Sequence, residues 1–255
     1  MVEDVPWRTI LLVGTGVALA TTVGQWTVTT GIGPWMRPVG FAVIAAGILA
    51  GRPAKWGVAA GLLLTGVLTT GWSTGVTWAV AGFVTASIST RLWARDDGER
   101  DESWSAWAFR YGVVVMSGVL MFAATSAWLF DVLGRAAFSV TVGWTVATNL
   151  PMAVLGAPFI RLALEYVGEG ERGLRASPTP RIRAAVVLIV LGWTVGGYVG
   201  GFLFRVVELV SRGGIAERLG PAVEGFITIW GWQGTHAQLL LGIVSLTMIE
   251  LLLKR

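Results

Sequence analysis

Apolar residues run through this chain in long blocks that short polar segments separate. A helix of roughly 20 mainly apolar residues is what the hydrocarbon core of a bilayer requires. The pattern predicts eight membrane-spanning helices, at 9–31, 38–51, 55–71, 74–93, 107–133, 137–165, 183–204 and 233–253. The expected fold class is therefore all-α, a polytopic integral membrane bundle of about eight helices.

The second and third predicted helices are short, and only the turn Gly51-Arg52-Pro53-Ala54-Lys55 separates them. Together they could form a tight helical hairpin. Such a hairpin is tolerated at membrane depth only where neighbouring protein covers its irregular backbone, because lipid supplies no hydrogen bonds.

The polar segments divide the chain into three parts. Residues 1–167 form a six-helix membrane unit, residues 168–182 a linker that contains Pro178 and Pro180, and residues 183–255 a two-helix membrane tail. Within the tail, charged and apolar residues alternate irregularly over 205–231. This segment reads equally well as an amphipathic helix on the outer surface or as an ordinary outer loop.

Composition supports the membrane assignment. Apolar residues make up 54% of the chain, charged residues only 13%, and the mean hydropathy is +0.69. A soluble domain carries about a quarter charged residues. The 35 glycines also fit, since small residues allow spanning helices to approach closely. The lipid bilayer is the expected surrounding of this chain.

The basic residues set the expected orientation. With a cytoplasmic N-terminus and eight spans, fourteen of the nineteen lysines and arginines fall on the cytoplasmic side. Basic residues near membrane helices prefer that side. The rule therefore predicts a multi-pass protein of the cell membrane with both termini, and the loops at 94–106 and 168–182, in the cytoplasm.

Several classes of function are excluded by residue content. The chain has no cysteine and one histidine, His236, which removes disulfides, thiolate chemistry and multi-histidine metal sites. No motif of paired acids, metal ligands or a phosphate-binding loop is present. We therefore expect no enzyme, no cofactor and no metal. The net charge of +4 is spread over short loops, so no nucleic-acid partner is expected.

The chain is rich in tryptophan, and its distribution is uneven. Of the 14 tryptophans, eight fall near the predicted outer boundary, five near the inner one, and Trp193 in the middle. An aromatic belt at the interface is the simpler explanation. Trp144, however, lies about 10 Å below the start of its predicted helix. An outward-facing pocket for a flat or cationic small molecule would use such residues.

Two polar residues extend this candidate pocket. Arg37, in the first outer loop, could recognise an anionic group through its planar guanidinium, or it could extend from a helix end into the headgroups. Asn149 lies about 18 Å below the outer end of its helix, where an amide either bonds a neighbouring helix or faces a ligand. The predicted substrate-binding residues are Trp35, Arg37, Trp72, Trp78, Trp128, Trp144 and Asn149.

Glycines recur every four residues in the seventh predicted helix, at Gly192, Gly196 and Gly200, with Gly197 and Gly201 beside them. This small-residue face predicts close approach of another helix, from this chain or from a partner.

The segment PVGFAVIAAGILAGRPAKWGVAAGLLLTGVLTTG (38–71) resembles the second and third helices of the S components of energy-coupling factor (ECF) transporters, their substrate-binding subunits. Residues 1–167 are similar to these proteins in helix number. The resemblance implies binding of a vitamin or metal ion from outside, under the loops at 31–37, 71–75 and 133–137.

Two functions follow as hypotheses. The first is a substrate-capture subunit that binds an unidentified small molecule from the outer side for uptake, with an energising membrane partner. The second is a structural or assembly subunit of a larger membrane protein complex. A membrane enzyme acting on lipid is the least favoured reading, because paired acid–base residues are lacking.

Overall fold

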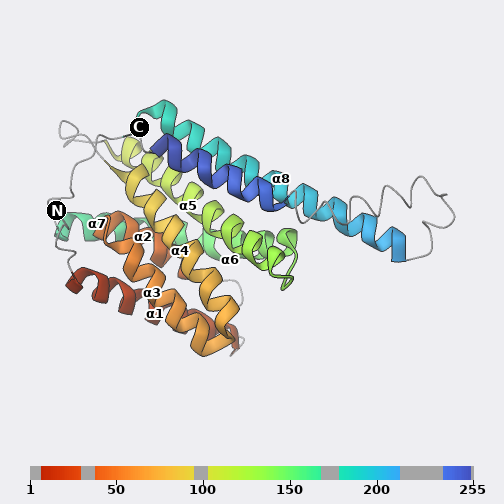
Figure 1. Ribbon diagram of the computed structural model, residues 1–255. Coiled ribbons are helices and arrows are strands. Elements are labelled where there is room, and N and C mark those ends of the chain that lie inside the picture. The colour runs from red at the N-terminus through yellow and green to blue at the C-terminus, as the bar shows by residue number, and fades with distance from the viewer. Residues whose placement is uncertain (1–6, 30–37, 95–102, 168–177, 213–237, 254–255) are drawn as a thin grey trace.

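The computed structural model describes residues 7–29, 38–94, 103–167, 178–212 and 238–253, which form helices and contain no strand. The helices are α1 (Trp7–Thr29), α2 (Val39–Ala50), α3 (Ala54–Thr70), α4 (Trp72–Trp93), α5 (Trp104–Val132), α6 (Phe138–Leu155), α7 (Ala157–Val167), α8 (Pro180–Arg212) and a C-terminal helix, Gln238–Leu253 (Figure 1). The all-α prediction is confirmed for this part of the chain.

Within the described residues, four helices are long and apolar enough to cross a membrane. They are Trp7–Trp26 of α1, Trp104–Val132, Phe138–Leu155 and Pro180–Phe202 of α8. α2, α3 and the C-terminal helix are apolar but shorter. The structure thus supports a membrane bundle, and the count of eight spans stays a prediction.

The sixth predicted helix, 137–165, is two helices. α6 ends at Leu155 and α7 begins at Ala157. Pro158 follows the break and has no N–H to donate to the preceding turn, so the α-helix is interrupted there. The Tyr111 hydroxyl of α5 donates to the carbonyl of Ala153 at 2.6 Å, and the Phe41 ring lies where a side chain at Gly156 would lie. Neighbouring helices therefore hold the break in place.

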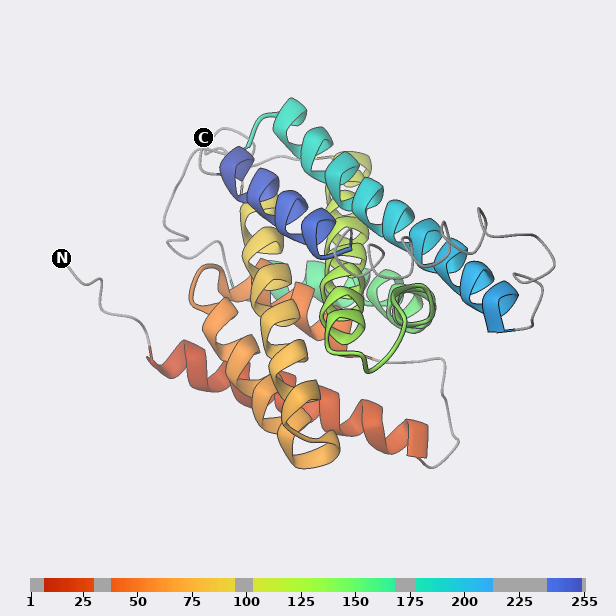
Figure 2. The ribbon, with the colours of Figure 1, turned by 45° about the vertical axis from the view of Figure 1, so that its right-hand side comes forward.

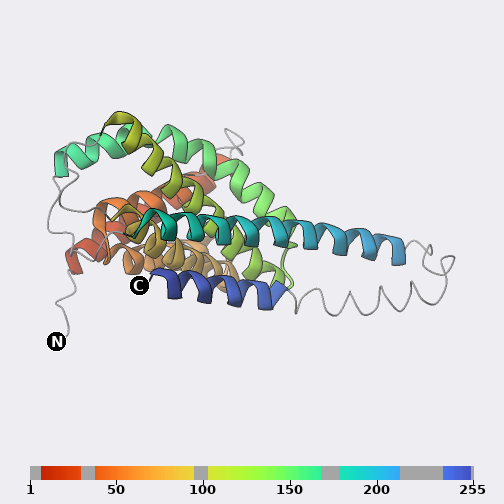
Figure 3. The ribbon, with the colours of Figure 1, turned by 90° about the horizontal axis from the view of Figure 1, so that it is seen from above.

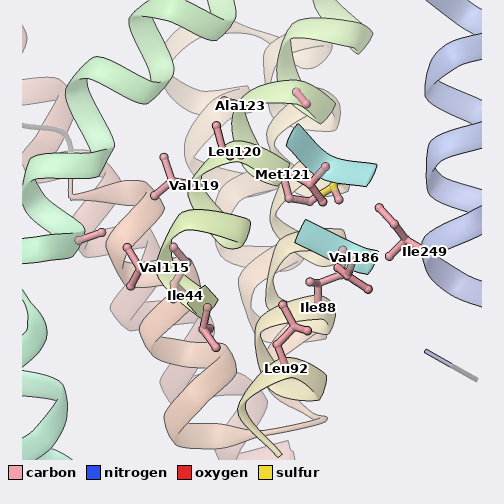
Figure 4. Packing of buried hydrophobic residues seen from close by; sticks show 14 of the residues in the cluster. Ile44, Ile88, Leu92, Val115, Val119, Leu120, Met121, Ala123, Val186 and Ile249 are labelled. Atoms are coloured by element: carbon pink, nitrogen blue, oxygen red, sulfur yellow. The ribbon is translucent and has the colours of Figure 1, made fainter. Parts of the chain in front are cut away.

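α5 is the central helix of the bundle. Every residue from Ser117 to Ala127 is buried, as expected for a helix that is apolar on all sides. Ile44 of α2, Val186 of α8 and Ile249 of the C-terminal helix meet α5 in one hydrophobic cluster (Figure 4). The predicted two-helix tail therefore shares a core with the predicted six-helix unit.

Glycines bring α1, α3 and α4 together on the side of the bundle that lies away from α8 (Figure 2). A Cβ on Gly57 would lie 2.6 Å from the Ile10 carbonyl oxygen, and a Cβ on Gly61 would collide with the carbonyl of Gly14. Gly71 alone connects α3 to α4, with a φ of 105° that side chains disfavour. Small residues thus replace larger apolar ones where these backbones pack, as in other membrane bundles.

α2 has only 12 residues and is about 18 Å long, shorter than the roughly 30 Å hydrocarbon core. At its start, the backbone N–H of Gly40 donates to Oδ1 of Asn149 at 2.7 Å. Near its end, the Thr90 hydroxyl lies 2.8 Å from the Gly47 carbonyl oxygen and 3.2 Å from that of Gly51. Neighbouring helices therefore cover the backbone at both ends of α2, as the sequence requires of this hairpin.

α8 and the C-terminal helix lie side by side on the outside of the bundle, and α8 projects beyond the other helices (Figures 1 and 3). The Gln238 amide donates to the Gly197 carbonyl at 3.0 Å. α8 continues to Arg212, so the first part of the ambiguous segment 205–231 is helical, and residues 213–231 lie outside the described ranges.

Candidate functional sites

Two ends of the bundle must be distinguished. At the Trp104 end, α4 ends and α5 begins, and the sequence predicts this end to be cytoplasmic. At the Gly134 end, α5 ends and α6 begins, and the sequence predicts the substrate pocket there. The names Trp104 end and Gly134 end denote position in the bundle and not the side of the membrane.

The predicted tryptophans of the Gly134 end have different surroundings. Trp72, at the start of α4, is 71% exposed, and Trp144 of α6 is 39% exposed. Trp78 packs against a cluster formed by α1, α2, α3, α4 and Phe122 of α5. Trp128 instead packs edge-to-face on Trp193 of α8, with the ring centroids 6.2 Å apart. Trp78 and Trp128 thus pack in different places, and the predicted pocket stays a prediction.

Asn149 serves as a bridge between two helices. It is 3% exposed, its Oδ1 accepts from Gly40 of α2, and its Nδ2 donates to the Thr145 carbonyl at 2.8 Å. Of the two readings of this amide, interhelical bonding is the one its contacts favour. The remaining predicted site residues, Trp35 and Arg37, lie outside the described residues.

The glycines of α8 divide into two faces. Gly197 and Gly201 are the closely packed ones, since a Cβ on Gly197 would overlap the Phe138 ring. Gly192 and Gly196 are exposed. A Cβ on Gly192 would meet no atom within 4 Å, and one on Gly196 would meet only Leu241, at 3.8 Å. Among the described residues, no helix of this chain approaches Gly192 and Gly196 closely, because α8 turns its other glycine face inward. Of the two alternatives for the approaching helix, a partner's helix stays a prediction.

An aromatic and cationic cluster occupies the Trp104 end. Trp104 stacks on Trp107 with centroids 5.1 Å apart, and Trp107 stacks on Tyr111 at the same distance. The guanidinium of Arg161 from α7 lies 4.6 Å from the Trp104 ring centroid. The guanidinium of Arg110, which is 6% exposed, lies 4.4 Å from the Trp93 ring centroid. Cations over indole faces are attracted by the ring quadrupole.

A shallow depression adjoins this cluster. It has a volume of about 330 Å³ and is lined by Trp104, Pro158, Arg161, Leu162 and Glu165. The Arg161 Nε lies 3.3 Å from Oε1 of Glu165. Its lining is therefore almost entirely apolar, and Arg161 and Glu165 contribute mainly the aliphatic parts of their side chains to it.

No motif in the sequence points to this depression. It exists because Pro158 ends α6 early and lets α7 lie across the start of α5. The i, i+4 spacing of Arg161 and Glu165 and the i, i+3 spacing of Trp104 and Trp107 are visible in the sequence. The break between α6 and α7, which brings the two pairs together, is not apparent in the apolar pattern of 137–165.

Comparison with known proteins identifies no relative of this chain. The chain matches no protein-family model, and no curated protein or solved structure is significantly similar to it. The resemblance of residues 1–167 to the ECF S components therefore stays a prediction.

Proposed function

We propose that this chain is a structural or assembly subunit of a larger complex in the cell membrane, and that the exposed face of α8 receives a spanning helix of a partner subunit. The observation that carries the proposal is the exposure of Gly192 and Gly196 in the middle of a helix long and apolar enough to cross a membrane.

The physical reason is that a glycine on a lipid-facing surface stabilises nothing unless another helix packs on it. A glycine exposed to lipid contributes no side-chain contact and lowers helix propensity by about 1 kcal/mol relative to alanine. Glycines spaced by four allow a second helix to approach closely, which increases van der Waals contact. The space above Gly192 is open, and the large side chains beside it, Leu188 and Val195, are also exposed. A partner helix would fill this surface.

The experiment compares two exposed glycines. Gly192→Leu adds bulk where no atom of this chain lies within 4 Å, and Gly16→Leu does the same on α1. Both variants should keep the thermal stability of the isolated chain in detergent. After gentle solubilisation of the membrane, a partner protein in fixed stoichiometry should accompany the wild type and Gly16→Leu, and should be lost from Gly192→Leu. Equal retention by both variants would remove α8 as the docking helix.

Substrate capture is the competing hypothesis. It requires a site at the Gly134 end that includes Trp35 and Arg37, which lie outside the described residues, and an energising partner. Native mass spectrometry of the purified chain separates the two functions. A tightly bound small molecule in the absence of any partner protein favours capture, whereas a stoichiometric protein partner without a ligand favours assembly.

A further inference from the structure

Oxygen atoms gather at the C-terminal end of α2. The Thr90 hydroxyl of α4 lies 2.8 Å from the carbonyl oxygen of Gly47 and 3.2 Å from that of Gly51. It also lies 2.9 Å from the carbonyl oxygen of Ala86, one turn earlier in its own helix. A hydroxyl has a single proton to donate. Three carbonyl acceptors therefore share one donor.

The proton of Thr90 has a natural place in its own helix. A helical threonine commonly donates to the carbonyl four residues earlier, as Thr21 and Thr65 do in this chain. When Thr90 donates to Ala86 in this way, the lone pairs of its Oγ1 face the carbonyl oxygens of α2. Electron-rich oxygens at such distances repel one another, and a cation between them turns the repulsion into attraction.

The end of a helix adds to this negative potential. Gly47 carries one of the last four carbonyls of α2, which have no N–H partner within a helix and form the negative end of its dipole. The Gly51 carbonyl accepts from the Ala54 N–H at 3.1 Å, and its second lone pair is left for another ligand. Membrane proteins hold Na⁺ with such helix ends and K⁺ with backbone carbonyls.

This place is open to the solvent on one side only. Gly47 and Ala86 are buried, whereas Gly51 and Thr90 are partly exposed, so an ion can enter and keep some of its water. Ser89 packs beside them, with its Cβ 2.9 Å from the position that a Cβ on Gly47 would take. The Ser89 hydroxyl is completely buried and has no hydrogen-bond partner within the described part of the chain. It is a further polar group at the same turn of α2.

The contacting groups and their neighbours determine the charge of the ligand. The converging oxygens belong to carbonyls and a hydroxyl, whereas proteins hold Ca²⁺ and Mg²⁺ largely with carboxylates. The turn after α2 also carries two bases, the exposed Arg52 and Lys55, whose ammonium lies 5.2 Å from the centroid of the Phe83 ring. Both bases repel a divalent ion twice as strongly as a monovalent one. A single positive charge fits best.

We propose that the C-terminal end of α2 binds a monovalent alkali cation, held by the carbonyl oxygens of Gly47 and Gly51 and by Oγ1 of Thr90. The Thr90 hydroxyl donates its proton to Ala86, and water completes the shell of the ion. The bound ion links α2, α4 and the turn into α3 at the Trp104 end. This site is separate from the α8 surface and independent of the assembly function.

The test measures the melting temperature of the full chain in detergent, in equal concentrations of KCl, NaCl and choline chloride. Choline carries the same charge and cannot enter between converging oxygens. The wild type should melt about 3 °C higher in KCl or NaCl than in choline chloride, as expected for a ligand well above its Kd. Thr90→Val should lower the melting temperature in every salt and abolish the difference between salts. Thr90→Ser keeps a hydroxyl and should restore that difference.

Thr141→Val is the matched control, because the partly buried Thr141 hydroxyl donates to the Ala137 carbonyl at the start of its own helix. This variant should keep the difference between salts. Equal melting temperatures of the wild type in all three salts overturn the proposal, and so does a difference that persists in Thr90→Val. Loss of the difference in Thr141→Val as well would show a general effect of the salts on the folded chain, and would also overturn it.

Discussion

Asn149 and Gly40 lie 109 positions apart in the sequence, and the side-chain Oδ1 of the one accepts a hydrogen bond from the backbone N–H of the other at 2.7 Å. The bond joins the middle of α6 to the start of α2. The first N–H groups of any helix have no partner within the helix, and in a membrane they need one. Asn149 supplies it.

The first prediction concerns this bond. Asn149→Ala should lower the free energy of unfolding by about 1 kcal/mol, because the Gly40 N–H loses its acceptor in an apolar surrounding. Thermal unfolding in detergent measures the change. Thr247→Ala is the control, since its exposed hydroxyl donates only to its own helix, at the Ile243 carbonyl. Equal stability of the two variants would mean that Asn149 does not bridge the helices.

The second prediction separates the two glycine faces of α8. Gly197→Ala should destabilise the chain, because the new methyl group would overlap the Phe138 ring. Gly196→Ala should be neutral or slightly stabilising, since its methyl group has room and alanine favours helices. Melting temperatures in detergent should differ by several degrees between the variants. A lower melting temperature for Gly196→Ala than for Gly197→Ala would reverse the assignment of the inward face.

The third prediction concerns the break between α6 and α7. Tyr111→Phe removes the hydroxyl that donates to the Ala153 carbonyl at 2.6 Å and should cost about 1 kcal/mol of stability. Tyr198→Phe is the control, because Tyr198 is 46% exposed on α8. Hydrogen exchange of α7 should rise in the first variant and stay unchanged in the second. Unchanged exchange in both would mean that the hydroxyl does not hold the break.

The fourth prediction is the orientation. A cysteine placed at Ser103 or Ser177 is the only one in the chain. In intact cells, neither should react with a membrane-impermeant maleimide, because the positive-inside rule places both loops in the cytoplasm. Both should react after permeabilisation. Labelling in intact cells would invert the predicted topology.

The helices of this chain are largely readable from sequence, whereas its contacts are not. The predicted bounds of the first five helices, for example 107–133 for α5 (Trp104–Val132), agree with the structure to within three residues. Apolar blocks and glycine turns such as Gly71 are local signals, so they predict the helix bounds without knowledge of the tertiary contacts. The break at Gly156 is not apparent from hydropathy, because Pro158 lies within a long apolar block.

The candidate site was harder to predict for a physical reason. A tryptophan near a membrane boundary is favourable in lipid, in a pocket or in a packed core, and hydropathy is the same in each case. Trp72 is exposed, whereas Trp128 packs on Trp193. Only the rotation of each helix distinguishes these outcomes, and that rotation depends on residues far apart in the chain. The glycine pattern of α8 is ambiguous in the same way, because Gly192 and Gly196 lie on one face of the helix and Gly197 and Gly201 on another.

The bond that covers the start of α2 also constrains how the protein is made. The partner of Gly40 is synthesised 109 residues later, which takes roughly 5 to 20 s at ordinary translation rates. During that interval α2 has no Asn149 to cover its first turn, so the hairpin of α2 and α3 cannot settle at its final depth. We expect it to remain near the insertion machinery or the bilayer surface until α6 emerges, so that biogenesis ends with a rearrangement rather than with the insertion of the last helix.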